Sequence, residues 1–132
     1  MKKLLMIACT ALALVSCGGG GSSANKDAKA DFQLDAVKMK ELDTAMDDAV
    51  RKPYMGKMIE MKGYITKSQK SGTSADPNKF SFHLSPTATE DGTNYTICYT
   101  DDDPSGSIGK QVTVKGTFEY PGAAGLKNAI FY

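Results

Sequence analysis

The residue types best suited to chemistry are scarce in this 132-residue chain, which has one histidine and three cysteines. A single histidine, His83, cannot supply a multi-histidine zinc site. A nucleophile triad would need His83 beside Ser81 or Ser85, with an acid placed by folding, and nothing in the spacing indicates one. We therefore expect no catalytic residue, no metal site and no cofactor, and interpret the protein as non-enzymatic.

The segment Asp101–Gly106 is the other stretch with ligand chemistry. Its sequence, Asp-Asp-Asp-Pro-Ser-Gly, fits positions 1, 3, 5 and 6 of a calcium-binding EF-hand loop. Position 12 would be Val112, where the loop requires a bidentate glutamate, and we expect a strand rather than a helix to follow. We interpret the segment as a polar turn, with a weak cation site as the alternative.

Size and charge exclude several classes of protein. The chain is long enough for one domain, and its composition of 41% hydrophobic and 23% charged residues is that of a globular protein. The 16 basic and 15 acidic residues nearly cancel. A multidomain enzyme, a polytopic membrane protein and a strongly basic nucleic-acid binder are therefore not expected.

The N-terminus reads as an export signal. Lys2 and Lys3 precede the stretch Leu4–Val15, which is apolar except for Thr10 and too short to span a bilayer core of ~30 Å. The sequence Leu-Val-Ser-Cys that ends at Cys17 resembles a bacterial lipobox. This resemblance implies a signal peptide over 1–16 and a lipid on Cys17; an ordinary secretory signal with a spare cysteine is the alternative.

The residues after Cys17 suggest a tether and a destination. Four glycines and two serines follow it, so we predict a lipidated cysteine with a Gly/Ser-rich tether over 17–34. Glycine rather than aspartate at position 18 indicates, by the familiar sorting pattern, the outer membrane. We expect a lipid-anchored protein of the cell envelope that faces the periplasm, in which Cys98 has no intramolecular partner and is a buried hydrophobe.

One helix is expected between Asp35 and Lys52. Asp35 can cap its start, Arg51 and Lys52 suit its last turn, and Pro53 ends it. Apolar residues recur at helical spacing and are expected on its inner face, namely Leu42, Met46, Ala49 and Val50.

From Gly56 onward the apolar period is two, which is typical of strands. In each of four segments the apolar residues occupy alternate positions, so they lie on one face of a strand. The segment 126–132 makes a fifth strand. The four runs are Ile59-Met61-Gly63-Ile65, Phe80-Phe82-Leu84, Tyr95-Ile97-Tyr99 and Val112-Val114-Gly116-Phe118.

The first and fourth of these strands repeat one pattern. Segments 56–65 and 109–118 both read Gly-Lys-x-apolar-x-apolar-Lys-Gly-x-apolar. The second glycine of each, Gly63 or Gly116, falls in mid-strand, where glycine usually marks a bend, a bulge or a close approach. Two bent strands among five are what a small closed barrel requires. We predict a mainly β domain over 35–132, a five-stranded OB-fold barrel preceded by one N-terminal α-helix.

The same features resemble a known family. The segment Leu42–Tyr54, the two Gly-Lys strands and the terminal Asn128-Ala129-Ile130 are similar to the tRNA_anti-like group of small bacterial OB-fold proteins. Members are often exported lipoproteins with a helix before the barrel. The resemblance implies this fold and anchorage, and it brings no catalytic motif.

An OB barrel binds ligands on the face of its second and third strands and in the adjoining loops. That face would carry Ser81, His83, Thr96 and Cys98 if the aromatic residues point inward, or Phe80, Phe82, Tyr95 and Tyr99 if they point outward. We expect the inward arrangement, because a barrel of this size needs large residues inside. The candidate contact residues are then Lys67, Lys70, Lys79 and His83.

Charge decides between partners. From Gly56 to Tyr132 the charges of eight lysines are balanced by those of eight acidic residues, so the barrel lacks the positive surplus that drives binding to phosphates. Besides the membrane reached through Cys17, we therefore expect an envelope protein, a glycan or a small polar ligand. A single-stranded nucleic acid is the alternative.

Overall fold

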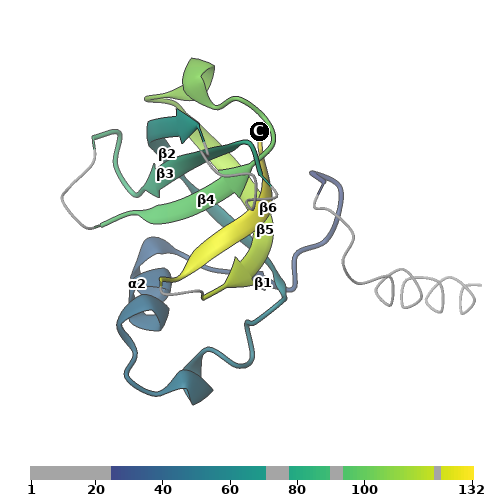
Figure 1. The fold of residues 1–132 in the computed structure, drawn as a ribbon, viewed down its shortest axis with the longest axis vertical. Coiled ribbons are helices and arrows are strands. Elements are labelled where there is room, and N and C mark those ends of the chain that lie inside the picture. The colour runs from purple at the N-terminus through teal and green to yellow at the C-terminus, as the bar shows by residue number, and fades with distance from the viewer. Residues whose placement is uncertain (1–24, 71–77, 90–93, 121–122) are drawn as a thin grey trace, which may run out of the picture.

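The computed structural model describes residues 25–70, 78–89, 94–120 and 123–132. Its body is a closed barrel of five strands with one α-helix at one end (Figure 1). This confirms the predicted fold class, a mainly β domain with an OB-type barrel. The predicted signal peptide (1–16), Cys17 and the first part of the tether lie outside the described residues.

The barrel strands follow a Greek-key order. They are connected as β2-β3-β4-β6-β5, and the pairing of β5 with β2 closes the sheet. All neighbours are antiparallel except β4 and β6, which are parallel. The strands are β2 (Met58–Lys70), β3 (Phe80–Ser85), β4 (Thr96–Thr100), β5 (Gln111–Glu119) and β6 (Gly125–Phe131).

The α-helix α2 (Ala36–Thr44) precedes the barrel strands, as predicted, but it is not the first element. A two-residue strand, β1 (Phe32–Gln33), comes before it and pairs in parallel with β2. The predicted cap is confirmed, because the Asp35 carboxylate accepts the Lys38 N–H at 2.8 Å. The helix ends at Thr44 rather than at Lys52, so the predicted C-terminal boundary was wrong.

The early end of α2 changes which residues are buried. Met39 and Leu42 enter the core, whereas Met46 and Val50, predicted on the inner face, are exposed. The chain instead forms the 3-10 helix η2 (Asp48–Val50). The prediction failed because the last carbonyl groups of α2 are taken by a side chain farther along, Arg51, and not by the amides of another helical turn.

The two mid-strand glycines lie where the barrel bends. β2 pairs with β5 as far as Tyr64 and with β3 from Tyr64 onward, so Gly63 precedes the change of partner. A Cβ atom at Gly63 would lie 2.7 Å from the Ser85 carbonyl oxygen, and one at Gly116 would lie 3.0 Å from the Leu126 Cβ. The prediction that these glycines allow a close backbone approach is confirmed.

The inward residues match the predicted parity on three strands. Ile59, Met61 and Ile65 of β2 are buried, as are Phe82 and Leu84 of β3 and the apolar residues Val112, Val114 and Phe118 of β5. On β4 the parity was predicted wrongly. Cys98 is fully buried inside the barrel, and Tyr95, Ile97 and Tyr99 lie on the outer face, half-buried.

The volume of the barrel explains this reversal. Cys98 is paired in register with Phe82, Thr96 with Leu84, and Thr100 with Phe80. Each large residue of β3 therefore faces a small residue of β4, an alternation that lets side chains fill a narrow barrel. If the tyrosines pointed inward they would meet the phenylalanines across the strands, and the interior could not hold both.

The N-terminal segment is fastened to the wall formed by β2 and β5. Asp31 exchanges hydrogen bonds with the Met58 backbone at 2.8 and 2.9 Å. Lys115, on the outer face of β5, is only 6% exposed, and its ammonium donates to the carbonyl oxygens of Lys26, at 2.8 Å, and Ala28. Residues 25–34 of the predicted tether therefore lie against the barrel.

We expect Gly63→Ala to lower the free energy of unfolding by about 2 kcal/mol, because the added methyl group would overlap backbone that cannot move freely. The matched control is Gly106→Ala, since a Cβ there would have nothing within 4 Å. That control should change stability by no more than about 1 kcal/mol. Urea unfolding followed by circular dichroism measures both, and equal effects would contradict the proposed bend.

Candidate binding groove

In the ribbon, α2 lies below β4 (Figure 1). A groove lined by residues of both elements runs along the outer surface of β4. It consists of two hollows of about 230 Å³ and 140 Å³ that share Ile97, Ala123 and Ala124 as lining residues. We call the two together the β4 groove. The larger hollow is also lined by α2 residues and by Tyr95, and the smaller one by Tyr99, Glu119, Gly125 and Lys127.

The outward parity of β4 supplies the aromatic residues of the β4 groove. Tyr95 and Tyr99 are four residues apart on one face, about 13 Å along an extended chain. The ring of Tyr95 stacks on His83 of the neighbouring strand, with the ring centroids 3.8 Å apart and the planes 3° from parallel. Stacking restrains both rings, so this end of the groove is formed in advance of any ligand.

A glycine forms the floor of the smaller hollow. Gly125 is buried beside Tyr99, and a Cβ atom at this position would lie 3.0 Å from the Ile97 carbonyl oxygen and 3.9 Å from a carbon of the Tyr99 ring. Above this floor the Lys127 ammonium lies 3.8 Å from the Glu119 carboxylate and 5.9 Å from the Tyr99 ring centroid. The smaller hollow thus combines an aromatic ring (Tyr99), a hydrogen-bond donor (Lys127) and an acceptor (Glu119) around the backbone of Gly125.

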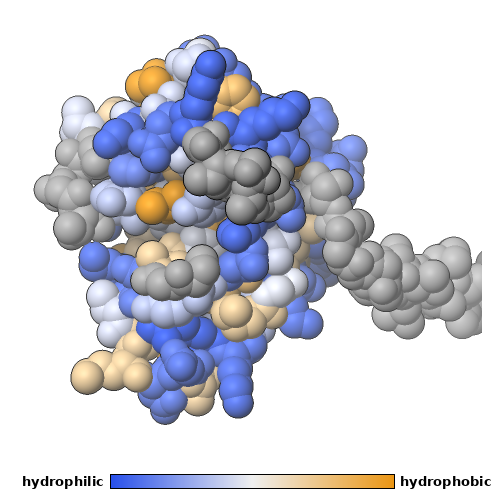
Figure 2. Space-filling model, in the orientation of Figure 1, coloured by the Kyte–Doolittle hydropathy of each residue, from blue (hydrophilic) through white to orange (hydrophobic). Residues whose placement is uncertain are grey.

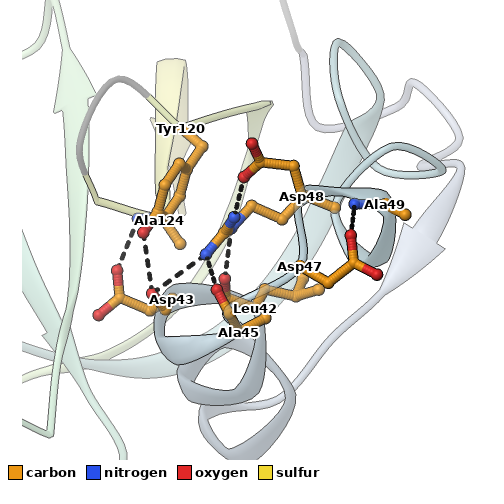
Figure 3. Close-up of polar contacts among 9 residues, drawn as sticks. Leu42, Asp43, Ala45, Asp47, Asp48, Ala49, Tyr120 and Ala124 are labelled. Carbon is orange, nitrogen blue, oxygen red and sulfur yellow. Dashed lines mark hydrogen bonds and ion pairs between the residues drawn. The ribbon is translucent and has the colours of Figure 1, made fainter.

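Arg51 holds the helical side of the groove in place (Figure 3). Arg51 is 4% exposed, and its Nε donates to the Leu42 carbonyl oxygen at 2.7 Å. One terminal nitrogen donates to the Ala45 carbonyl oxygen and the other to the Asp48 carboxylate. The guanidinium carbon also lies 3.6 Å from the Tyr120 ring centroid, close enough for a cation–π contact.

The same cluster joins α2 to the chain between β5 and β6 (Figure 3). The Tyr120 hydroxyl donates to the Asp43 carbonyl oxygen at 3.0 Å, and the Ala124 N–H donates to the Asp43 carboxylate at 2.8 Å. Asp43 and Ala124 both line the larger hollow. These hydrogen bonds therefore fix the width of the larger hollow, where α2 and the chain before β6 meet.

The predicted contact residues fall into two places. Lys67 pairs with His83, and His83 with Ile97, so these two predicted residues lie in one row with the β4 groove. His83 is on the outer face of its strand, as predicted. Lys70 is the last residue of β2 and Lys79 directly precedes β3. Both are exposed and lie near the aspartate turn, and neither lines the groove.

The aspartates of the 101–106 segment support a turn. Asp101 Oδ1 accepts hydrogen bonds from the Asn78 amide and the Lys79 N–H, and Asp103 Oδ1 accepts the Ser105 N–H at 3.0 Å. The Ser105 N–H, then its hydroxyl, and finally the charge of Lys70 lower the pKa of Asp103. Within the described ranges, no three His, Cys, Asp or Glu side chains group as metal ligands would.

The sequence analysis named Tyr95 and Tyr99 only as the alternative in which the aromatic residues point outward, and it missed Ile97, Glu119 and Lys127. The tyrosines were not preferred because hydrophobicity favours tyrosine inside, and Glu119 and Lys127 reach the groove from β5 and β6. A usable signal was the run Thr96, Cys98 and Thr100, whose small side chains complement three large residues on the preceding strand.

Comparisons with protein-family models, curated proteins and solved structures found no match for this chain. The resemblance to the tRNA_anti-like group therefore stays a prediction. In the part of the chain that the structure describes, no helix has both the length and the apolar character needed to cross a membrane. The function must be argued from the groove itself.

We expect Arg51→Ala to lower the free energy of unfolding by about 3 kcal/mol, because it leaves helix-end carbonyl groups without donors and removes a buried ring contact. The neighbouring exposed residue gives the control, Lys52→Ala, which should change stability by less than about 0.5 kcal/mol. Urea unfolding measures both variants. Faster hydrogen exchange at the Ala124 amide in Arg51→Ala would show that the groove wall loosens; unchanged exchange and stability would refute this role.

Proposed function

We propose that the protein is a non-enzymatic, lipid-anchored OB-fold binding module of the bacterial cell envelope, which holds its ligand in the β4 groove. The observation that carries this proposal is the position of the groove. It lies over the third strand of the barrel and beside the last loop, and OB folds take oligonucleotides and oligosaccharides at the corresponding surface. The lipobox at Cys17 and the resemblance to exported OB-fold proteins support the anchorage.

Binding rather than catalysis suits the chemistry of the groove. Cys98 has its side chain in the core, and burial raises the pKa of its thiol far above the ordinary value, so the thiolate needed for attack is not formed. The Asp43 carboxylate already accepts an amide hydrogen, and Glu119 is paired with Lys127. Among the described groove residues, these contacts leave no nucleophile next to a base.

A single-stranded nucleic acid is the second candidate. The stacked rings of His83 and Tyr95, with Tyr99 beyond them, are the kind of platform on which bases stack. The equal numbers of lysines and acidic residues from Gly56 onward argue against it, because phosphate binding draws its affinity from a positive surplus.

The groove can be tested by nuclear magnetic resonance titration with named probes: an oligothymidylate and tetramers of β-linked glucose, galactose and N-acetylglucosamine. We expect at least one probe to shift the amides of 94–99 and 123–127 and not those of 58–62 on the opposite wall. Ala123→Trp should abolish the response, because Ala123 lines both hollows, whereas Ser105→Trp should not. Shifts confined to other surfaces, or none, would overturn the proposed site.

The anchor needs a separate test. When the bacteria are grown with an alkyne-tagged fatty acid, the wild-type protein should be labelled and Cys17→Ala should not. Cys98→Ala is the matched control and should keep its label, because Cys98 is buried in the barrel. Each buried methylene of a chain adds ~0.8 kcal/mol to membrane binding, so several chains on one residue hold it firmly. An unlabelled wild-type protein would refute the anchorage.

A further inference from the structure

The β4 groove carries an inference about ligand class, which rests on the proposed function. We propose that the groove binds an uncharged oligosaccharide, with sugar rings packed against Tyr95 and Tyr99 and hydroxyl groups hydrogen bonded to Glu119 and Lys127. Three features of the groove support this ligand: its aromatic surfaces, its paired charges and its length.

The Tyr99 ring offers an apolar surface of the size of a sugar ring. It is half-buried, and it lines the smaller hollow together with Gly125 and the apolar side chain of Ile97. The face of an aromatic ring carries partial negative charge, which attracts the polarised C–H groups on one face of a pyranose. Tyr99 is already restrained by packing, so little conformational entropy is lost when a sugar settles on it.

The ion pair beside Tyr99 matches hydroxyl groups in both directions. Its side chains are 27% exposed at Lys127 and 41% exposed at Glu119, so each can still be reached from the groove. A hydroxyl group both donates and accepts, and neighbouring hydroxyls of one sugar can bond to the carboxylate and the ammonium at once. A polyanion would meet the Glu119 carboxylate and a polycation would meet Lys127, so a neutral ligand fits best.

The length of the groove indicates several linked sugars. Tyr95 and Tyr99 are about 13 Å apart along the chain, a span that a single ring cannot cover. The two hollows adjoin each other at Ile97, Ala123 and Ala124, which line both, and the larger hollow adds Asn94, Lys40 and Asp43 as polar lining. We therefore expect a tetramer to bind more tightly than the corresponding monomer.

Two other occupants fit less well. A peptide cannot add to β4 as a strand, because β4 is already paired with β3 on one side and β6 on the other. An apolar protein surface would need an apolar patch, but the visible face in Figure 2 is mostly hydrophilic, with apolar residues in separate spots.

The test is isothermal titration of the wild-type protein with the three neutral tetramers, the corresponding monomers and the oligothymidylate. We expect one tetramer to bind at least tenfold more tightly than its monomer, with an affinity that changes little between low and high salt. Tyr99→Ala and Tyr95→Ala should each weaken binding at least tenfold. Tyr64→Ala, a change to a half-buried tyrosine that lines neither hollow, should leave it unchanged.

Variants that keep both aromatic rings control for the possibility that the tyrosine-to-alanine variants lose binding because they do not fold. Glu119→Gln and Lys127→Met should each weaken binding several-fold, whereas Tyr99→Phe should retain it because the stacking surface remains. If only the oligothymidylate binds in the groove, with a steep salt dependence, the sugar class is overturned and the groove stands. If no tetramer binds while another probe still shifts the groove amides, the sugar class is likewise overturned and the groove remains as a binding site. If no probe reaches the groove, both proposals fail.

Discussion

The interior of the barrel has no room for large side chains on both β3 and β4, and this limit shapes the outer surface of the molecule. β3 contributes Phe82 and Leu84 to the inside, so β4 can contribute only small residues opposite them, such as Cys98. The alternation of a strand then forces Tyr95 and Tyr99 outward. The aromatic surface of the groove is thus a consequence of how the core is filled.

The walls of the groove depend on a second constraint, the need of helix-end carbonyl groups for donors. Arg51 meets that need from outside the helix, and in doing so it allows α2 to stop at Thr44. Asp43, at the helix end, is then free to accept the Ala124 amide. One buried guanidinium therefore sets both where the helix stops and how it is joined to the barrel.

Much of the fold could be predicted from the sequence, because strand periodicity and mid-strand glycines reflect local geometry. The repeated Gly-Lys pattern located two bent strands, and Asp35 marked the start of the helix. The parity of β4 and the end of α2 could not be predicted in this way. Both depend on residues outside the element itself, namely the phenylalanines of the neighbouring strand β3 and an arginine beyond the helix end that reaches back. The groove was missed for the same reason, and among the predicted contact residues only Lys67 and His83 lie near it.

The buried ammonium of Lys115 determines which side of the barrel the N-terminal segment occupies. It holds residues 26–28 against β5, whereas β4 is separated from β2 by β3 and from β5 by β6. The N-terminal segment and the tyrosine-bearing side are consequently on different flanks of the barrel. Residues 25–34 line neither hollow, so the segment held by Lys115 leaves the side that carries the tyrosines uncovered.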